Sequence, residues 1–427
     1  MKMIEKIYQH FSQTCLISTD SRKIEKGCVF VALKGEKFDG NDFAYQVACD
    51  NIAACVIADR KDLPQHERLF IVNDSLEALQ QLATLHREKH NIPLIGITGT
   101  NGKTTTKELV AAVLSQKYNT VFTQGNFNNH LGVPLTLLQI NDSTELAVVE
   151  MGANHPYEID FLCKIAKPDY GIITNIGKAH LQGFGSFDGV IKTKKEIYDY
   201  LKEHKGKIFL NIDNELLRNL AADADSYTYG KNPNADIKAE IVSANPYLTI
   251  KWDDSTIKTR LVGDYNFENV LAAISVGSFF NIDKQIIINA IENYTPKNNR
   301  SQFIKTDKNE IVMDAYNANP VSMKHAINNF RNISTDNSLL ILGDMGELGE
   351  DSEKEHQEII HLINDLNFKD VIFIGETFSK ICKELNFNTF NNVESLIDHL
   401  RYNNLSGRKI LVKGSHFIHL ERLIDYL

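Results

Sequence analysis

The segment GITGTNGKTTTKEL at residues 96–109 contains the residue types of a phosphate-binding loop in an unusual order. The usual loop has one glycine, four further residues and then Gly-Lys-Ser/Thr. Counting back from Gly102 places that first glycine at Ile97, with Gly96 and Gly99 on either side. The segment is therefore a degenerate phosphate-binding loop, a chance match, or a variant of this loop that belongs to another family.

The surroundings of this segment favour phosphate binding. Residues 94–98 (LIGIT) have the pattern of a buried strand, and a helix begins at about Lys103 after a glycine turn. In this geometry, backbone N–H groups and the helix N-terminus surround a phosphate. A plain glycine turn is the alternative, but a cation at the helix start would then only oppose the helix dipole. We predict that Lys103 reaches the outer phosphates and that Thr104 offers a hydroxyl to magnesium.

Three further residues are candidates for a metal site. Magnesium held by a threonine and phosphates usually has a carboxylate ligand as well. Glu150 ends the strand-like run ELAVVE, at the sheet edge where ligands of parallel sheets bind. His180 follows the next strand-like run on the same side of the sheet, and Lys194 lies fourteen residues later. From spacing alone, a solvated glutamate, an ordinary histidine and an exposed helical lysine remain open alternatives.

Composition restricts the class of protein. The 427 residues are too many for one core, and 43% hydrophobic with 24% charged residues is typical of a folded protein without low-complexity tracts. The net charge of −9, with no long basic block, argues against nucleic acid as a partner. No apolar run has the length of a membrane span, and the six cysteines form no C-x-x-C pair. We expect a cytoplasmic protein that does not insert into membranes, with buried thiols.

The elements that position the loop fall into three α/β domains. Residues 1–91 carry three short strand-like runs and a helix at about 75–89, before the break NIP. Residues 92–296 alternate strands and helices, which predicts a parallel-sheet domain around the phosphate loop. After a second break at 294–300, residues 297–427 predict a smaller Rossmann-like domain.

Several ordered motifs resemble those of the Mur ligases, the amino-acid-adding ATPases that build the peptidoglycan precursor. Besides the loop they are EMGA, NIGKAHLQGFGS, GNFNNHLGVPLTLL, GDYNFENVLAAISVG, DAYNANPVSM, LGDMGELG and LVKGS. The YNANP and LGDMGELG segments resemble the members that add D-alanyl-D-alanine. The stretch at residues 18–43 resembles the nucleotide-sugar domain shared by the last two ligases of the pathway.

The resemblance implies a role for each matching residue. It implies an ATP site made by Gly99, Thr100, Asn101, Gly102, Lys103, Thr104, Thr105, Asn269, Arg300 and Asp314. It implies one magnesium ion on Thr104 and Glu150 and a second on His180 and Lys194, with Lys194 carbamylated, and it makes Lys103, Glu150, His180 and Lys194 the catalytic set. The UDP part of the acceptor would bind at Asp20, Ser21 and Arg22, and the incoming dipeptide at Tyr316, Asn317 and Asn319.

Two departures from the family pattern affect these expectations. Asn298 and Asn299 precede Arg300 where many relatives have a glycine next to the arginine. Asn41 stands where the family has a histidine in its N-terminal Asp-Gly-His-Asp-Phe pattern, which affects contacts with the UDP-sugar.

The expected activity is ATP-dependent ligation of D-alanyl-D-alanine to a UDP-N-acetylmuramoyl-tripeptide through an acyl phosphate, by a monomer. One alternative is the preceding ligase of the pathway, which adds the third residue. A second is a non-catalytic protein that binds nucleotide as a switch, although this leaves Lys194 and the N-terminal motif unexplained.

Overall fold

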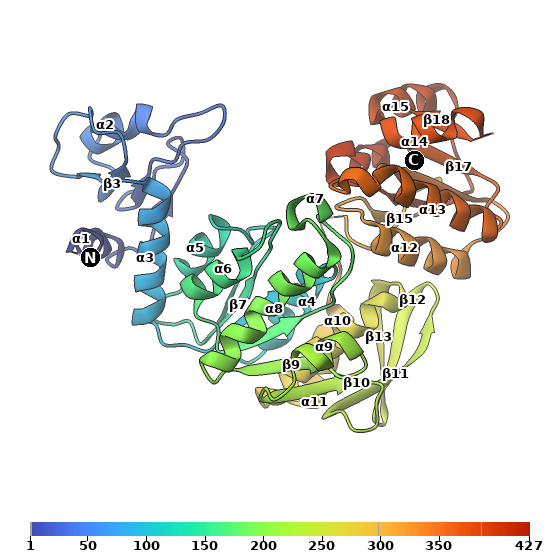
Figure 1. Cartoon of the computed structure of the whole chain (residues 1–427), viewed down its shortest axis with the longest axis horizontal. Helices are drawn as coiled ribbons and strands as arrows, with labels where there is room; N and C mark the ends of the chain where they lie inside the picture. Colours follow the sequence, from blue (N-terminus) through green and yellow to red (C-terminus); the bar gives the residue numbers. More distant parts are fainter. Residues whose placement is uncertain (1, 298, 386) are drawn as a thin grey trace.

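The computed structural model describes residues 2–297, 299–385 and 387–427, which form three α/β domains in chain order (Figure 1). The N-terminal domain is a four-stranded parallel sheet in the order β1-β2-β3-β4 with three helices. Its elements are α1 (Lys2–Phe11), β1 (Ile17–Ser18), β2 (Val29–Val31), α2 (Asn41–Cys49), β3 (Cys55–Ala58), β4 (Leu69–Ile71) and α3 (Ser75–Lys89). The small α/β domain expected from the sequence is confirmed.

Helix α3 joins the N-terminal domain to the central one. It begins where the Asp74 side chain accepts a hydrogen bond from the Glu77 N–H, a standard N-terminal cap. Its buried side chains, such as Leu82, belong to one hydrophobic cluster that also contains Leu137 and Met151 of the central domain. The first two domains therefore share a continuous core.

The central domain is built on a nine-stranded sheet in the order β13-β12-β11-β10-β9-β8-β5-β7-β6. Its strands are β5 (Leu94–Thr98), β6 (Thr120–Phe122), β7 (Leu146–Glu150), β8 (Tyr170–Ile173), β9 (Lys207–Asn211), β10 (Ser226–Gly230), β11 (Ile237–Ala244), β12 (Tyr247–Trp252) and β13 (Ser255–Val262). Its helices are α4 (Lys103–Leu114), α5 (Gly132–Leu137), α6 (Glu158–Ala166), α7 (Leu181–Phe184), α8 (Phe187–Glu203), α9 (Glu215–Leu220), η1 (Asp264–Asn266), α10 (Phe267–Phe279) and α11 (Lys284–Asn293).

The expected parallel sheet is found from β11 to β6, but two more strands extend it in antiparallel fashion. The pairs β11–β12 and β12–β13 are antiparallel, so the whole sheet is mixed. Along β13 buried and exposed residues alternate, as in a strand with one solvated face. The sheet around the loop is thus as expected, whereas the antiparallel extension was missed.

The C-terminal domain has a six-stranded sheet in the order β14-β15-β19-β16-β17-β18, parallel except for the β14–β15 pair. Its strands are β14 (Gln302–Lys305), β15 (Glu310–Asp314), β16 (Ser338–Gly343), β17 (Val371–Ile374), β18 (Asn388–Phe390) and β19 (Lys409–Lys413). Its helices are α12 (Pro320–Ile333), η2 (Gly349–Asp351), α13 (Ser352–Asp365), α14 (Glu376–Ile381), η3 (Cys382–Glu384), α15 (Val393–Tyr402), η4 (His416–Ile418) and η5 (Leu420–Tyr426). The predicted Rossmann-like domain is confirmed.

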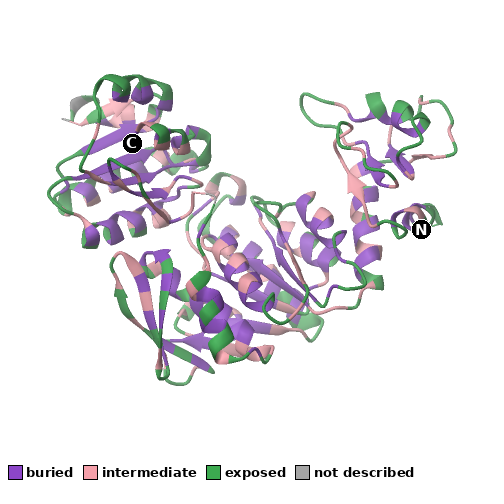
Figure 2. Cartoon of the chain, turned by 180° about the vertical axis from the view of Figure 1, so that it is seen from behind, coloured by how far each residue is buried: buried purple, intermediate pink, exposed green. Residues whose placement is uncertain are grey.

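Burial follows this layered architecture. Seen from behind, most strands of the central and C-terminal sheets are largely buried, while exposed residues lie on the outer helix faces, on loops and along β11 and β13 (Figure 2). No helix in the described residues is long and apolar enough to cross a bilayer. The carboxyl ends of β5, β7 and β8 open into a cleft of about 1600 Å³ between the central and C-terminal domains.

Candidate active site

The phosphate loop is a tight turn between β5 and α4. Gly99 and Gly102 have φ values of +145° and +78°, backbone conformations that residues with a Cβ rarely adopt. A Cβ on Gly102 would also lie 2.5 Å from Oδ1 of Asn269, and one on Gly99 would lie 2.0 Å from Oγ1 of Thr174. Both glycines are therefore required by the turn and by its close neighbours.

The end of β8 holds this loop in place. The N–H of Thr100 donates to the Asn175 carbonyl at 2.9 Å, and the N–H of Asn101 donates to the Asn175 side chain at 3.0 Å. The Thr174 hydroxyl donates to the Asn101 carbonyl at 2.6 Å. These bonds fix the turn in a defined conformation.

Lys103, the first residue of α4, folds back over the loop. Its Nζ donates to the carbonyls of Gly99 at 2.8 Å and Thr100 at 3.1 Å. Burial lowers the pKa of Lys103, the Glu150 carboxylate opposes this shift, and Arg300 adds to it. The ammonium thus lies at the turn where the outer phosphates of a nucleotide would bind.

Glu150 has a carboxylate oxygen without a partner. Its Oε1 accepts the Thr104 hydroxyl at 3.1 Å and the Asn128 amide at 2.8 Å. Its Oε2 is buried and has no hydrogen-bond partner among the described residues. A buried carboxylate oxygen left bare is costly, so a cation beside it would satisfy the site.

Lys194 lies on α8 and is only 2% exposed. Its Nζ lies 5.6 Å from the centre of the Phe184 ring. Burial, reinforced by the positive charge of Lys103, lowers the pKa of Lys194 to about 7. A large part of this amine is therefore neutral near pH 7, which is the form that reacts with carbon dioxide.

His180 lies at the N-terminus of α7 and lines the same cleft as Glu150. Its Nδ1 contacts the Glu347 carboxylate of the C-terminal domain, and this contact holds the pKa of Glu347 below its usual range. Nearby, the Lys178 ammonium lies 3.2 Å from the Glu355 carboxylate, also across the two domains. The segment at residues 176–185 thus makes two ionic contacts with the C-terminal domain.

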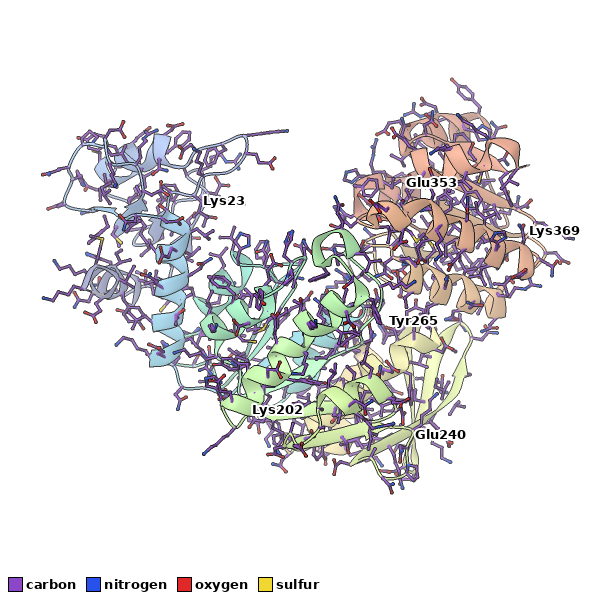
Figure 3. All side chains as sticks on the ribbon, in the orientation of Figure 1. Lys23, Lys202, Glu240, Tyr265, Glu353 and Lys369 are labelled. Atoms are coloured by element: carbon purple, nitrogen blue, oxygen red, sulfur yellow. The ribbon has the colours of Figure 1, made fainter. Side chains whose placement is uncertain are left out.

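The C-terminal domain supplies a second wall of the cleft. The Arg300 guanidinium stacks 3.6 Å from the centre of the Tyr316 ring. Asp314 pairs with the buried Lys413 ammonium at 2.6 Å and accepts the Ser301 N–H at 3.2 Å. Tyr265, labelled in Figure 3, lies where the central and C-terminal domains meet.

One contact joins this wall directly to the loop. The Asn319 side chain donates to Oδ1 of Asn101 at 2.7 Å while it also caps α12.

Comparison with known proteins identifies the family to which this cleft belongs. Residues 97–277 match the model of the Mur ligase middle domain, residues 299–416 that of the Mur ligase glutamate ligase domain, and residues 15–87 that of the Mur ligase family catalytic domain. A UDP-N-acetylmuramoyl-tripeptide–D-alanyl-D-alanine ligase of Bacillus subtilis (strain 168) is 36% identical over 98% of this chain and 94% of its own. The chain belongs to the Mur ligase family.

Solved Mur ligase structures have the same architecture. A MurF from Acinetobacter baumannii superposes with a TM-score of 0.85 at 31% identity, covering 96% of this chain and 92% of its own. A MurF from Thermotoga maritima in complex with ADP superposes with a TM-score of 0.83 at 28% identity, covering 96% of both chains. The resemblance to MurF-type ligases inferred from the motifs is confirmed.

The fold brings most of the expected Mur ligase residues to one cleft. The expected residues that line it are Thr100, Asn101, Gly102, Lys103, Thr104, Thr105, Glu150, His180, Asn269, Arg300, Asp314, Tyr316 and Asn317. Gly99, Asn319 and Lys194 are not among the lining residues; Gly99 and Asn319 support the loop through the contacts above, and Lys194 is buried. Asn298 lies outside the described residues.

The residues expected to bind UDP are not part of this cleft. Asp20 and Arg22 form a bidentate ion pair in which both nitrogen–oxygen distances are 2.9 Å, and these bonds lower the pKa of Asp20 to about 2. Ser21 lies between them in the chain, and Lys23, the next residue after Arg22, is labelled on the N-terminal domain in Figure 3. The UDP contacts of these residues stay predictions.

Asn41, the departure from the family histidine, is buried in the same domain. Its amide donates to Asp39 and Asp59, both at 2.8 Å. These bonds give the Asn41 side chain a structural role within the N-terminal domain.

The metal-binding side chains of the cleft suit a magnesium ion only if substrate oxygens complete its coordination. No group of three or more His, Cys, Asp or Glu side chains within the described part of the chain could hold an ion alone. Magnesium, however, commonly takes one or two carboxylates and completes its shell with phosphates and water. The bare Oε2 of Glu150 beside Thr104 therefore fits such an ion at the loop.

Several supporting residues were not singled out from the sequence. Asn128 orients Glu150, Asn175 fixes the loop, and Lys413 neutralises Asp314. All three residues lie within the motifs GNFNNHLGVPLTLL, NIGKAHLQGFGS and LVKGS, so the motifs identified their segments but not the residues that they contact.

Proposed function

We propose that this chain is an ATP-dependent ligase that joins D-alanyl-D-alanine to the terminal carboxylate of a UDP-N-acetylmuramoyl-tripeptide, giving ADP, phosphate and the pentapeptide. The observation that carries the proposal is the match over 98% of the chain to a relative named for this reaction. It is supported by the cleft that collects the phosphate loop, Glu150 and His180 beside the C-terminal domain.

The reaction would proceed in two steps whose atoms balance. A carboxylate oxygen of the tripeptide attacks the γ-phosphorus of ATP; the new O–P bond forms, the bond to the β-phosphate oxygen breaks, and ADP leaves. The dipeptide amine then attacks the acyl carbon, phosphate leaves, and the ammonium proton passes to solvent or phosphate. The first step brings two anions together, so charge neutralisation is the main demand on the protein.

The residues of the chain would meet this demand at the loop. Lys103 and the loop N–H groups would bind the phosphates, with Asn269, Arg300 and Asp314 near the rest of the nucleotide. Thr104 and Glu150 would hold one magnesium ion, and His180 with a carbamylated Lys194 a second; bound there, the ions would offset the negative charge that opposes phosphoryl transfer. Burial and the lowered pKa of Lys194 support carbamylation because that reaction needs a neutral amine.

The remaining assignments complete the proposal. We assign residues 1–91 to a domain that binds the UDP-sugar, residues 92–296 to a domain that binds ATP, and residues 297–427 to a domain that binds the dipeptide. Asp20, Ser21 and Arg22 would contact UDP, and Tyr316, Asn317 and Asn319 the dipeptide. The monomeric state and the cytoplasmic location stay predictions.

One assay separates the proposal from its alternatives. ADP formation should require UDP-N-acetylmuramoyl-tripeptide and D-alanyl-D-alanine together. Turnover with a UDP-N-acetylmuramoyl-dipeptide and a single amino acid would instead identify the preceding ligase of the pathway. Nucleotide binding without amine-dependent ADP formation would indicate a nucleotide-regulated binding protein.

A further inference from the structure

The loop that follows β16 carries an acidic residue of the C-terminal domain to His180, which lines the cleft. Glu347 lies in this loop, within LGDMGELG, and its carboxylate contacts Nδ1 of His180 on the central domain. Nδ1 of His180 is buried and has no partner with hydrogen-bond geometry among the described residues, so the Glu347 carboxylate is its ion-pair neighbour rather than an aligned acceptor. The buried Nδ1 of His180 thus faces an acidic residue of another domain.

The surrounding loop is built to hold Glu347 in this position. The Met345 N–H donates to His356 at 3.0 Å, and the Gly346 N–H donates to the Ser415 hydroxyl at 2.8 Å. Glu347 itself has a φ of +61°, a left-handed conformation that costs energy for a residue with a Cβ. Such conformations persist where the surrounding structure fixes them, and they are concentrated at functional sites.

The contact determines which ring nitrogen of His180 can bind a ligand. A neutral imidazole whose Nδ1–H faces a carboxylate presents the lone pair of Nε2 on its other side. Histidines that bind metals almost always donate their second ring N–H to a carboxylate or carbonyl, which fixes the tautomer and the ring orientation. His180 lines the cleft together with Glu150, so this arrangement suits a metal ligand there.

We propose that Glu347 is a positioning residue that orients His180 for the second divalent cation, so that this cation site is complete only when the C-terminal domain is docked. The inference rests on the proposed function, because it takes His180 as a ligand of that ion. It assigns a role to the C-terminal domain beyond binding the dipeptide: this domain supplies the partner that makes His180 an effective ligand.

A plain interdomain tether is the competing explanation, and the chain contains a matched control. Lys178 and Glu355 form an ion pair across the same two domains, two residues before His180, without contacting the His180 ring. Removing either pair weakens docking, but only removal of Glu347 should change the affinity of the His180 site. Lys178→Gln therefore measures the tether alone.

The test counts bound Mn²⁺ by electron paramagnetic resonance, with a non-hydrolysable ATP analogue bound to the full-length protein. The wild type should bind two ions, and Glu347→Ala should weaken the second about 10- to 100-fold while the first stays within twofold. Glu347→Gln keeps an oxygen acceptor and nearly the same shape, so its affinity for the second ion should lie between those of the wild type and Glu347→Ala. In a His180→Ala background, Glu347→Ala should add no further loss. Retention of the first ion shows that each variant is folded.

Three results would overturn the inference: a single Mn²⁺ in the wild type, wild-type affinity for the second ion in Glu347→Ala, or an equal loss in Lys178→Gln. The ligase assay keeps this failure separate from failure of the proposed function. Wild-type ADP formation that requires both substrates, together with an unchanged second ion in Glu347→Ala, would refute only the role of Glu347. Absence of that ADP formation would refute the function itself.

Discussion

Thr104 donates its hydroxyl to Oε1 of Glu150 at 3.1 Å, which joins the first turn of α4 to the end of β7. The two residues follow or end the neighbouring parallel strands β5 and β7. Asn128 donates to the same oxygen at 2.8 Å, and the other carboxylate oxygen, Oε2, has no partner among the described residues. These hydrogen bonds give the Glu150 carboxylate a fixed orientation, which is what strong electrostatic stabilisation requires.

Removal of Asn128 should weaken the ion site without removing a ligand. In Asn128→Ala, Glu150 keeps both oxygens but loses the bond that orients them. Loss of such a supporting bond typically costs 10- to 100-fold in metal affinity, so we expect the Mg²⁺ concentration for half-maximal ADP formation to rise by about 10-fold or more. Asn126→Ala, which changes an exposed neighbour, is the control. An unchanged Mg²⁺ requirement in Asn128→Ala would show that Glu150 needs no such support.

Lys103 should be indispensable for turnover. Replacing it by alanine removes the cation beside the loop carbonyls, and loss of one preorganised charge of this kind typically costs about 3–4 kcal/mol, or ~100- to 1,000-fold in rate. Lys117→Ala is a matched control, because Lys117 is exposed beyond the other end of the same helix and bonds only to the carbonyls of Phe280 and Asn281. Steady-state ADP formation measures both variants. Full activity in Lys103→Ala would refute the phosphate assignment.

Carbamylation of Lys194 should depend on pH in a defined direction. Its pKa of about 7 means that the neutral amine, which reacts with carbon dioxide, becomes scarce as the pH falls below 7. With ¹³C-bicarbonate, a carbamate signal in the ¹³C spectrum should be present at pH 8 and decline toward pH 6. The signal should be absent in Lys194→Met and present in Lys195→Met, which alters the partly exposed neighbouring lysine. A signal that survives in Lys194→Met would assign the modification elsewhere.

The sequence predicts local elements well because their signals are local. The strand over residues 94–98 and the helix from Lys103 follow from an apolar run, two glycines and a change of periodicity, and both lie where expected. The β11–β13 strands were missed although they alternate buried and exposed residues, because a strict alternation of strand and helix was assumed for the whole domain.

Partners far apart in the chain could not be predicted in this way. Asn128 and Glu150 are brought together by the order of the strands, and Glu347 meets His180 only because two domains dock. Nothing in the spacing of these residues encodes either contact. A recognisable motif marks a segment as functional, but only the fold determines which atoms it contacts.

Side-chain bonds cross the junction near residues 91–93. Although the helical pattern breaks there, Arg87 donates to the Ala166 carbonyl at 3.0 Å and pairs with Asp169 at 3.0 Å. Together with the shared core of α3, these bonds favour the first two domains moving as one body. Residues 294–300, with positive φ at Asn299, are the better candidate for a hinge.

His86 should make this shared core sensitive to acid. Its side chain is 1% exposed, with Nε2 lying 2.7 Å from the Ile140 carbonyl of the central domain and Nδ1 lying 3.2 Å from the Tyr8 hydroxyl. Burial lowers the pKa of His86 to about 4, while the Ile140 carbonyl opposes the shift and His90 adds to it. Because the folded pKa lies below the ordinary value of about 6.5, the unfolded chain binds the proton first as the pH falls.

The free energy of unfolding should therefore be greatest above pH 6.5 and decrease between pH 6.5 and 4, by up to about 3 kcal/mol from this residue. Urea midpoints followed by circular dichroism from pH 7.5 to 4.5 would measure the decrease. His86→Gln keeps a donor for the carbonyl and an acceptor for Tyr8 but does not titrate, so its midpoint should depend less on pH than that of the wild type. His361→Gln, at an exposed position of α13, should behave like the wild type. Parallel pH profiles for wild type and His86→Gln would place the acid sensitivity in other groups.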